Sequence, residues 1–202
     1  MPKIVDHDAR RRELVAATWR IIGRGGFAAA SLQSVEMEAG FSHGIVRHYF
    51  ASKEELLAQA FSEAYEHTLT RAVNAIGDGS GLEALRKLCL ELFPLDDERL
   101  LEAQVVVAFW DHAAFNPQLA AIHTEAVGTW KRLFLRYLDE ALEEGSIRPG
   151  TPIETVANQL LFVVNGVQVM PLLTPCHAEP ARQLAVLDFI IDSIRANIVH
   201  AR

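Results

Sequence analysis

Residues 41–56, FSHGIVRHYFASKEEL, decide how the N-terminal part of the chain folds. Just before them, Ser31 can cap a short helix, and Gly40 can adopt the positive φ of the tight turn that follows it. Ser42 can then cap a second helix of about two turns that ends at Phe50. Two short helices joined by a four-residue turn that contains glycine form the sequence pattern of a helix-turn-helix.

The polar residues of this stretch suit DNA recognition. The second helix of a helix-turn-helix enters the major groove, whose width of ~12 Å admits a helix, and its N-terminal residues reach base edges. Arg47 is the best candidate for contacting a base, because its guanidinium matches O6 and N7 of guanine. Gly44 would let the backbone approach DNA closely, and Ser42 with the helix N-terminus could hold a phosphate. The expected DNA contacts are Ser31, Gln33, Ser42, His43, Gly44, Arg47, His48, Tyr49 and Lys53.

Other readings of the same residues stay open. A histidine on a helix is usually structural or solvated, so His43 and His48 count as contacts only because they lie beside Arg47 and Lys53. The basic run Arg10–Arg12 fits either an arm on DNA or a charged helix start. The apolar side chains expected in the core of the motif are Val35, Ala39, Phe41, Ile45, Val46 and Phe50.

Composition indicates a folded protein, and its charge distribution fits either an N-terminal part that meets a polyanion or an ordinary solvated basic face. Half of the 202 residues are hydrophobic, and the formal net charge is −7. Residues 1–53 hold eight Lys or Arg against five Asp or Glu, a balance of +3, which leaves −10 for the remainder. There are two cysteines and no Cys-x-x-Cys pair, which suits a reducing compartment. No signal peptide and no run of ~18 apolar residues is evident, so we expect a cytoplasmic protein without a membrane span.

The run from Leu14 through GGFAAASLQSVEMEAGFSHGIVRHYFASKEELL resembles the N-terminal domain of TetR-family transcriptional regulators, and HYF followed by SKEELL is a specific part of that pattern. GIVRHYF is closer to the choline-responsive BetI-like branch. The resemblance implies a helix-turn-helix DNA-binding domain over residues 1–65. It also implies a helical regulatory, ligand-binding and dimerisation domain over residues 66–202. Such a protein is most often a repressor that binds a palindromic operator as a homodimer and is released by a small molecule.

Two positions depart from the family pattern. Glu36 stands where the family usually has a small alanine, so either its side chain points to solvent or the local helix packing differs. Arg47 stands where many members have tyrosine, which suggests a different operator preference.

Helical periodicity continues through the whole chain and predicts nine helices. The first, over residues 10–22, should stop at Gly25–Gly26. The fourth should begin with a capping box of Ser52 and Glu55 and end before a break at 78–81. The second and third helices are the two short helices of the helix-turn-helix pattern described above. The other five lie between the breaks at 78–81 and 93–97, and over residues 100–115, 119–144, 152–173 and 180–200, with Asp96 and Thr151 as candidate caps.

The final two helices are apolar nearly all round and need cover on both sides. A two-fold dimer that pairs these helices with their copies would provide it, whereas the alternative is that they form the buried core of a monomer. The residues expected at the dimer interface are Val156, Leu160, Val164, Val167, Leu187, Ile191, Ile194 and Ile198.

Large aromatic residues and interleaved polar groups mark the middle helices. AFWDHAAFNPQL and VVNGVQVM resemble the regulatory domain of the BetI-like branch, which implies a ligand pocket there. Aromatic residues at helical spacing are more often core, but a Trp-rich site could also hold a quaternary ammonium by cation–π contact. The pocket candidates are Phe93, Phe109, Trp110, His112, Trp130, Phe134, Phe162, Asn165 and Gln168.

Two other classes of function fit the sequence less well. An enzyme is disfavoured because the chain has no His-Glu-x-x-His, Gly-x-Gly-x-x-Gly or Gly-x-x-x-x-Gly-Lys motif. A helix-turn-helix scaffold that binds protein partners would be compatible with the acidic body. We expect no cofactor and no metal, and the identity of the effector stays open.

Overall fold

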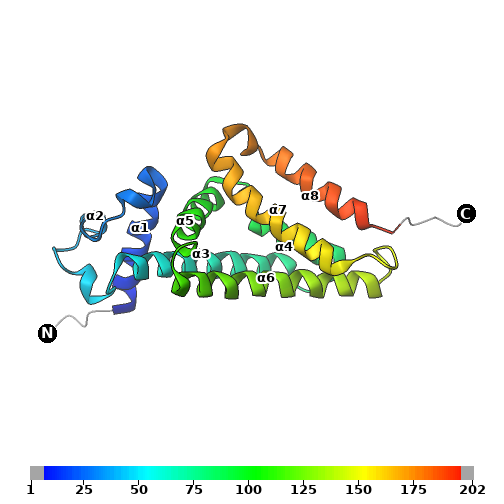
Figure 1. The fold of residues 1–202 in the computed structure, drawn as a ribbon, viewed down its shortest axis with the longest axis horizontal. Coiled ribbons are helices and arrows are strands. Elements are labelled where there is room, and N and C mark those ends of the chain that lie inside the picture. The colour runs from blue at the N-terminus through cyan, green and yellow to red at the C-terminus, as the bar shows by residue number, and fades with distance from the viewer. Residues whose placement is uncertain (1–6, 197–202) are drawn as a thin grey trace, which may run out of the picture. The chain divides into compact units, whose positions relative to one another are not determined.

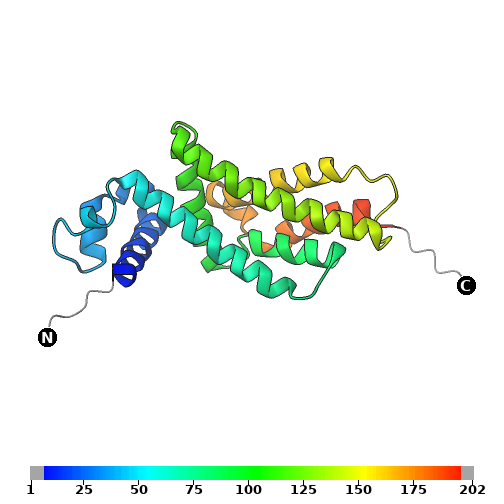
Figure 2. The ribbon, with the colours of Figure 1, turned by 90° about the horizontal axis from the view of Figure 1, so that it is seen from below.

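The computed structural model describes residues 7–196, which are almost entirely helical (Figures 1 and 2). The described part of the chain has eight α-helices and two short 3-10 helices, η1 and η2, and no strand longer than an isolated bridge. In chain order these are α1 (His7–Ala29), α2 (Leu32–Glu38), η1 (Val46–His48), α3 (Lys53–Ile76), α4 (Gly81–Leu92), α5 (Asp97–Ala113), α6 (Pro117–Glu143), α7 (Ile153–Leu173), η2 (Pro175–His177) and α8 (Pro180–Ile194). The all-α prediction is therefore confirmed, but the count of nine helices is wrong.

The chain divides into two compact units. The first comprises the residues up to Glu66 together with Leu101–Ile122, and the second comprises His67–Leu100 together with the residues from His123 onward. Residues 101–122 thus pack with the first unit, although they lie beyond the boundary that the sequence suggested at residue 65.

The core of the first unit follows the predicted face of α1. The buried residues of this face are Leu14, Ala17, Thr18 and Ile21. The buried Thr18 hydroxyl donates a hydrogen bond to the Leu14 carbonyl at 2.9 Å. The helix starts at His7, earlier than predicted, and its regular backbone breaks at Gly26, whose φ is +69°. Residues of α3 and α5 close the core, because the rings of Phe61 and Phe109 stack with centroids 4.0 Å apart.

Several helix starts are capped as the sequence indicated. The Ser31 hydroxyl accepts the Ser34 N–H at 3.0 Å, and the Asp96 carboxylate accepts the Arg99 N–H at 2.9 Å. At α3, Ser52 accepts the Glu55 N–H at 3.1 Å, while the Glu55 carboxylate reaches one residue beyond the expected donor, to Ala51, at 2.7 Å.

The helix starting at residue 153 has no such cap. The Thr151 hydroxyl donates to the Arg148 carbonyl at 2.6 Å, and Glu154 forms an ion pair with Lys131 on α6 at 2.9 Å. Thr151 is therefore not the helix cap that the sequence suggested, because its hydroxyl has another partner.

In the second unit, α7 runs toward η2 and α8 runs back from it (Figure 1). The last helix ends at Ile194 and not near residue 200, because the following residues leave the helix and pair with the loop before α7. Arg148 N–H donates to the Ile194 carbonyl at 3.0 Å, and Ala196 N–H donates to the Ser146 carbonyl at 2.9 Å.

The two cysteines lie in different environments. Cys89 is fully buried on α4, and burial raises the pKa of its thiol to about 12. Cys176 is exposed on η2. Both thiols are free, which agrees with the absence of a disulfide framework in the sequence.

Among the described residues, α7 is the one helix long and apolar enough to cross a membrane by length and composition. It is not an unbroken run of ~18 apolar residues, because Asn158 and Asn165 interrupt it. The evidence for a span is weak, since the core helix of a folded domain passes the same test. Here α7 buries Val156, Leu160 and Val164 inside the second unit.

Candidate nucleic-acid interface and regulatory region

The turn that ends α2 has the geometry predicted for a helix-turn-helix. Gly40 has φ +72°, its N–H donates to the Met37 carbonyl at 3.2 Å, and the Phe41 N–H donates to the Glu36 carbonyl at 2.9 Å. These two bonds form a Schellman motif, which requires a left-handed residue at the position of Gly40. The chain therefore reverses after α2 where the sequence indicated.

The segment that follows this turn is not an α-helix, contrary to the prediction for residues 42–50. A turn at residues 43–44 is followed by the short 3-10 helix η1, and Ser42 caps no helix. Gly44 has φ +88°, which lies outside the range of a right-handed helix. The β-branched Ile45 and Val46 also have low helix propensity. A further cause is the side chain of Glu36.

Glu36 is buried, with 3 % of its surface exposed, although it lies on a short surface helix. Its Oε1 accepts the Val46 N–H at 3.1 Å, and its Oε2 lies 3.2 Å from Nδ1 of His43. Burial raises the pKa of this carboxyl, but hydrogen bonds from the backbone of Gly44 and Val46 and the charge of His43 outweigh burial, so the pKa is lowered. The sequence left open whether this residue points to solvent, and it points inward.

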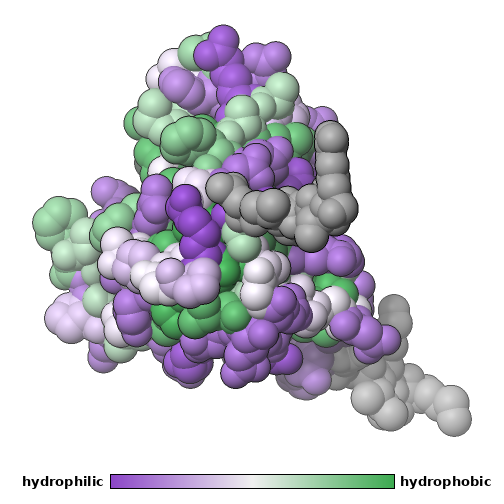
Figure 3. All heavy atoms as spheres, turned by 90° about the vertical axis from the view of Figure 1, so that its right-hand side faces the viewer, coloured by the Kyte–Doolittle hydropathy of each residue, from purple (hydrophilic) through white to green (hydrophobic). Residues whose placement is uncertain are grey.

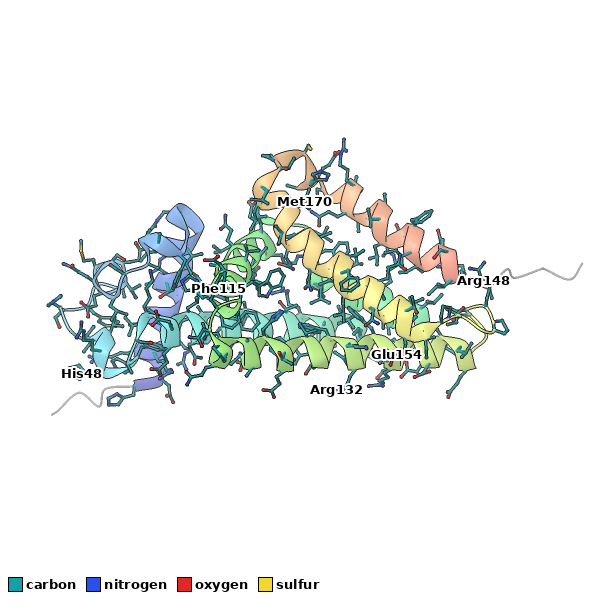
Figure 4. The ribbon with its side chains drawn as sticks, in the orientation of Figure 1. His48, Phe115, Arg132, Arg148, Glu154 and Met170 are labelled. Atoms are coloured by element: carbon teal, nitrogen blue, oxygen red, sulfur yellow. The ribbon has the colours of Figure 1, made fainter. Side chains whose placement is uncertain are left out.

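Most of the expected DNA contacts lie at the surface around this segment. The exposed members are Ser31, Gln33, Ser42, His43, Arg47 and His48, the last labelled in Figure 4. The His43 side chain is 84 % exposed, although its Nδ1 contacts the buried Glu36 carboxylate. No hydrogen bond or ion pair within residues 7–196 holds the Arg47 guanidinium, which is therefore free to reach a ligand. Gly44 and Tyr49 are half-buried.

Lys53 is engaged inside the first unit. Its ammonium donates to the Phe27 carbonyl at 2.8 Å and lies 3.9 Å from the centroid of the Phe27 ring. Burial lowers the pKa of this group. The Phe27 ring also contacts the His112 ring in an edge-on arrangement, with the ring centroids 4.1 Å apart. Lys53 thus ties the start of α3 to the end of α1.

Arg11 also serves the fold. Its guanidinium donates to the Tyr49 carbonyl at 3.0 Å, lies 4.4 Å from the Phe50 ring centroid and pairs with Glu55 at 3.7 Å. Of its two neighbours, Arg10 lies 5.8 Å from the Phe41 ring centroid and Arg12 is exposed. The central arginine of the basic run therefore belongs to a helix start that supports the segment after the turn.

The nine pocket candidates divide between the two units. In the first unit, Phe109 is fully buried, Trp110 is half-buried, and Nδ1 of His112 lies 3.1 Å from the Ala108 carbonyl. In the second unit, the rings of Phe93, Trp130 and Phe134 are buried. Asn165 and Gln168 of the second unit are half-buried, and the Gln168 amide donates to the Leu92 carbonyl at 2.5 Å.

Phe162 differs from the other pocket candidates. It is 76 % exposed on α7, so it lies at the surface of the second unit and not among the buried aromatic side chains. One buried acid had no signal in the sequence, namely Glu102 on α5, with 5 % of its surface exposed. Periodicity does not identify it, because it is a polar interruption of an apolar pattern. Within the described residues no group of three or more His, Cys, Asp or Glu is arranged to hold a metal ion.

The residues expected at a dimer interface lie mostly inside the protomer. Val167 is half-buried, and Ile198 lies outside the described residues. The other six fill the core of the second unit, each with at most 6 % of its surface exposed: Val156, Leu160, Val164, Leu187, Ile191 and Ile194. A helix that is apolar on both sides does not reveal from its periodicity which side faces inward.

The opposite faces of α7 and α8 carry apolar side chains that nothing within residues 7–196 covers. We call this set the outer apolar surface; it consists of Phe162 (76 % exposed), Met170 (42 %), Leu173 (74 %), Val186 (45 %) and Phe189 (75 %). Met170 is labelled in Figure 4, and Figure 3 shows hydrophobic residues, in green, at several places on the face that it views. Gly166 lies between Phe162 and Met170, and a Cβ atom added there would meet nothing within 4 Å.

Comparison with known proteins agrees with this geometry. Residues 14–60 match the family model described as bacterial regulatory proteins of the tetR family, and residues 81–196 match the C-terminal domain of the BetI-type transcriptional repressor. The transcriptional regulator PksA of Bacillus subtilis is 30 % identical over 195 residues, which cover 96 % of this chain and 94 % of PksA. The regulator BetI of Vibrio atlanticus is 26 % identical over 195 residues, which cover 95 % and 94 %.

Solved structures show the same fold. A transcriptional regulator from Rhodococcus sp. Rha1 aligns with a TM-score of 0.80 and 32 % identity over 91 % of this chain and 95 % of the other. A transcriptional regulator from Saccharomonospora viridis, solved in complex with choline, aligns with a TM-score of 0.86 over 94 % of this chain and 100 % of the other. The second is 20 % identical, so it informs on the fold alone.

Proposed function

The chain belongs to the TetR family of bacterial DNA-binding transcriptional regulators, with a BetI-type C-terminal domain, and from this premise we propose that it is a cytoplasmic repressor. It binds a palindromic operator as a homodimer, and a small molecule releases it. Like its relatives, the protein is a transcriptional regulator and not an enzyme.

The observation that carries the DNA-binding part is the exposed polar segment after α2. Ser42, His43, Arg47 and His48 are exposed there, and Arg47 has no partner within residues 7–196 that would compete with a base. Arg47 contacts guanine through O6 and N7, and the flanking groups contact phosphates or neighbouring bases. Ser31 and Gln33, exposed at the start of α2, contact the backbone of the same half-site.

The outer apolar surface supports the dimer. Large apolar side chains that stay three-quarters exposed, such as Phe162 and Phe189, are typical of an interaction site. We assign this surface to the contact between two copies, because it lies on the two last helices and because Gly166 would allow a partner helix to approach closely. A single segment with one Arg47 would bind one half-site weakly, whereas a two-fold dimer presents two copies of Arg47 to two half-sites.

The effector part rests on the BetI-type domain and on its buried aromatic residues. We propose a small molecule that fits among the helices of the regulatory domain, with a quaternary ammonium as the leading class, because Trp and Phe faces attract such cations. Trp130 and Phe134 are the leading candidates in the second unit. Titration calorimetry with choline and with uncharged apolar ligands of similar size tests this assignment, and an absence of heat with choline would reject the quaternary-ammonium class.

Induction requires only a modest coupling. Effector binding favours a spacing of the two DNA-binding segments that no longer matches successive major grooves. A coupling of about 1–3 kcal/mol changes affinity about 5- to 150-fold, which is sufficient for release. The continuous helix α3, which contributes residues to both units, is the proposed mechanical link.

The deciding experiment is fluorescence anisotropy with DNA from the region upstream of the gene, measured over a salt series with a scrambled duplex as control. We expect selective binding that weakens steeply with salt, because phosphate contacts release counterions. Arg47→Ala should retain much of the salt dependence and lose selectivity. If no duplex binds even at low salt, the scaffold that acts through protein partners becomes the better explanation.

A further inference from the structure

A carboxylate from α2 binds the segment that follows the turn. The donors are the backbone N–H of Val46 at 3.1 Å, Nδ1 of His43 at 3.2 Å and the backbone N–H of Gly44. All three lie within four consecutive residues, and the carboxylate that accepts from them is 4 % exposed. Glu36 is thus attached to the inner side of the segment whose outer side carries the exposed polar groups.

The backbone around this carboxylate has the form of an anion-binding nest. Successive N–H groups converge on one anion when a right-handed residue alternates with a left-handed one. Gly44, with φ +88°, supplies the left-handed position, and Ile45, with φ −66° and ψ −36°, supplies the right-handed one. Without the carboxylate, the N–H of the fully buried Val46 would lose its hydrogen-bond acceptor, which is unfavourable in the interior. The conformation of the segment therefore depends on Glu36.

The same contact orients the imidazole of His43. A ring nitrogen that faces a carboxylate carries the hydrogen, so Nδ1 is the protonated nitrogen. In the neutral ring, Nε2 then carries a lone pair and accepts a hydrogen bond. The His43 side chain is 84 % exposed, so Nε2 is open to a donor from outside the protein. In the major groove, the donors on base edges are the amino groups of adenine and cytosine.

We propose that Glu36 is a positioning residue for operator recognition. It fixes the backbone of residues 43–46 and holds His43 in the orientation and tautomer that present Nε2 to a base amino group, beside the base contacted by Arg47. This inference rests on the proposed DNA-binding function. It adds a specificity determinant that touches no DNA and assigns His43 to an adenine or cytosine.

The test starts from the wild-type protein and a randomised duplex pool. Sequencing of the bound fraction gives the preferred operator and the preference at each base pair. The same selection is then repeated with Glu36→Gln, His43→Ala, the double variant and Arg47→Ala. Glu38→Gln is the matched control: it is an acid on the same helix, but its carboxylate pairs with Arg20 and Arg24 and not with the segment.

Glu36→Gln should bind the selected duplex about tenfold more weakly, the equivalent of one charge-assisted hydrogen bond, whereas Glu38→Gln should stay within about twofold. The preference for adenine or cytosine should relax at one base pair, distinct from the pair that relaxes in Arg47→Ala. In the Glu36→Gln background, His43→Ala should cause little further loss, because its contact depends on Glu36.

Three results would overturn the proposal. These are a Glu36→Gln protein with wild-type selectivity, losses that add fully in the double variant, and a uniform loss at all base pairs, which a purely structural role would produce. If Glu36→Gln does not fold, Gly44→Ala serves instead, because alanine is strained at the positive φ that the nest requires, while the carboxylate remains. The selectivity of this variant at the same base pair should relax. Unchanged selectivity rejects the proposal. A wild-type protein that enriches no duplex would refute the DNA-binding function itself, and the proposal with it.

Discussion

Replacement of Phe162 or Phe189 with alanine should separate the two protomers of the dimer. Both side chains project from the outer apolar surface and are three-quarters exposed in the single chain, at 76 % and 75 %. Because only about a quarter of each side chain is buried in the protomer, neither contributes much to the folding of the second unit, and the folded protomer should survive either change. The cost should therefore fall on association and not on folding.

The size of the effect follows from the exposed fractions. Complete burial of a phenylalanine side chain is worth about 1.5–3 kcal/mol. Because about three-quarters of each ring remains to be buried, association gains roughly 1–2 kcal/mol per ring. A two-fold interface contains each residue twice, so one substitution costs roughly 2–4 kcal/mol, or a roughly 30- to 1,000-fold weaker dimer.

Sedimentation equilibrium over a range of protein concentrations measures this dissociation constant. Phe115→Ala is the matched control, because Phe115, at the turn between α5 and α6, is 88 % exposed but belongs to the first unit (Figure 4). The reasoning is refuted if Phe162→Ala and Phe189→Ala associate as the wild type does, or if Phe115→Ala dissociates the dimer instead.

Three further predictions concern the fold and its charges. Lys53→Met should lower the free energy of unfolding by about 1–2 kcal/mol, because it removes the hydrogen bond to the Phe27 carbonyl. The salt dependence of DNA binding should stay unchanged. A salt slope reduced by about one would show instead that Lys53 contacts a phosphate. Gly81→Ala should lower the unfolding free energy by about 1–2 kcal/mol in denaturant titration, since Gly81 has φ +54°, which strains an alanine, whereas the flexible Glu144 carboxylate can move away from the added Cβ atom. An unchanged midpoint would contradict this. Folding lowers the pKa of Glu36, so the stability that its carboxylate contributes is complete above the unfolded pKa and is lost as the pH falls through the folded pKa. Below about pH 5 the wild type should therefore lose more unfolding free energy than Glu36→Gln. Equal losses in the two proteins would exclude this linkage.

The features that the sequence predicted well are those with local causes. The buried face of α1 follows from helical periodicity, and the reversal after α2 follows from the need for a left-handed residue, which Gly40 meets. The caps at Ser31 and Asp96 likewise depend on groups three residues apart. Such features need no knowledge of the rest of the chain.

The failures share a different cause. Residues 42–50 do not form the expected helix, because the backbone donors there bind Glu36, which lies ten residues from Val46 in sequence. Lys53, expected at a phosphate because it follows the helix-turn-helix, is held in the protomer by the carbonyl and the ring of Phe27 from another helix, and the salt-slope measurement above tests its contact with DNA. In each case a side chain from elsewhere in the fold competes with the local preference.

Most residues expected at the dimer interface lie inside the protomer for a geometric reason. Helices α7 and α8 have two apolar faces each, so periodicity identifies both without ranking them. Burial ranks them, since Leu160 is 1 % exposed whereas Phe162, two positions further on, is 76 % exposed. Only the packed structure provides that distinction.

The contrast between the two cysteines makes the natural chain suitable for site-specific labelling. Because the Cys89 thiol is buried and its pKa is raised to about 12, it will not react with a maleimide at neutral pH while the protein is folded. Cys176, exposed on η2 where α7 leads into α8, remains available. A single fluorophore can therefore be placed at this junction without any substitution, where it would report on changes in the regulatory domain while DNA and effector are titrated.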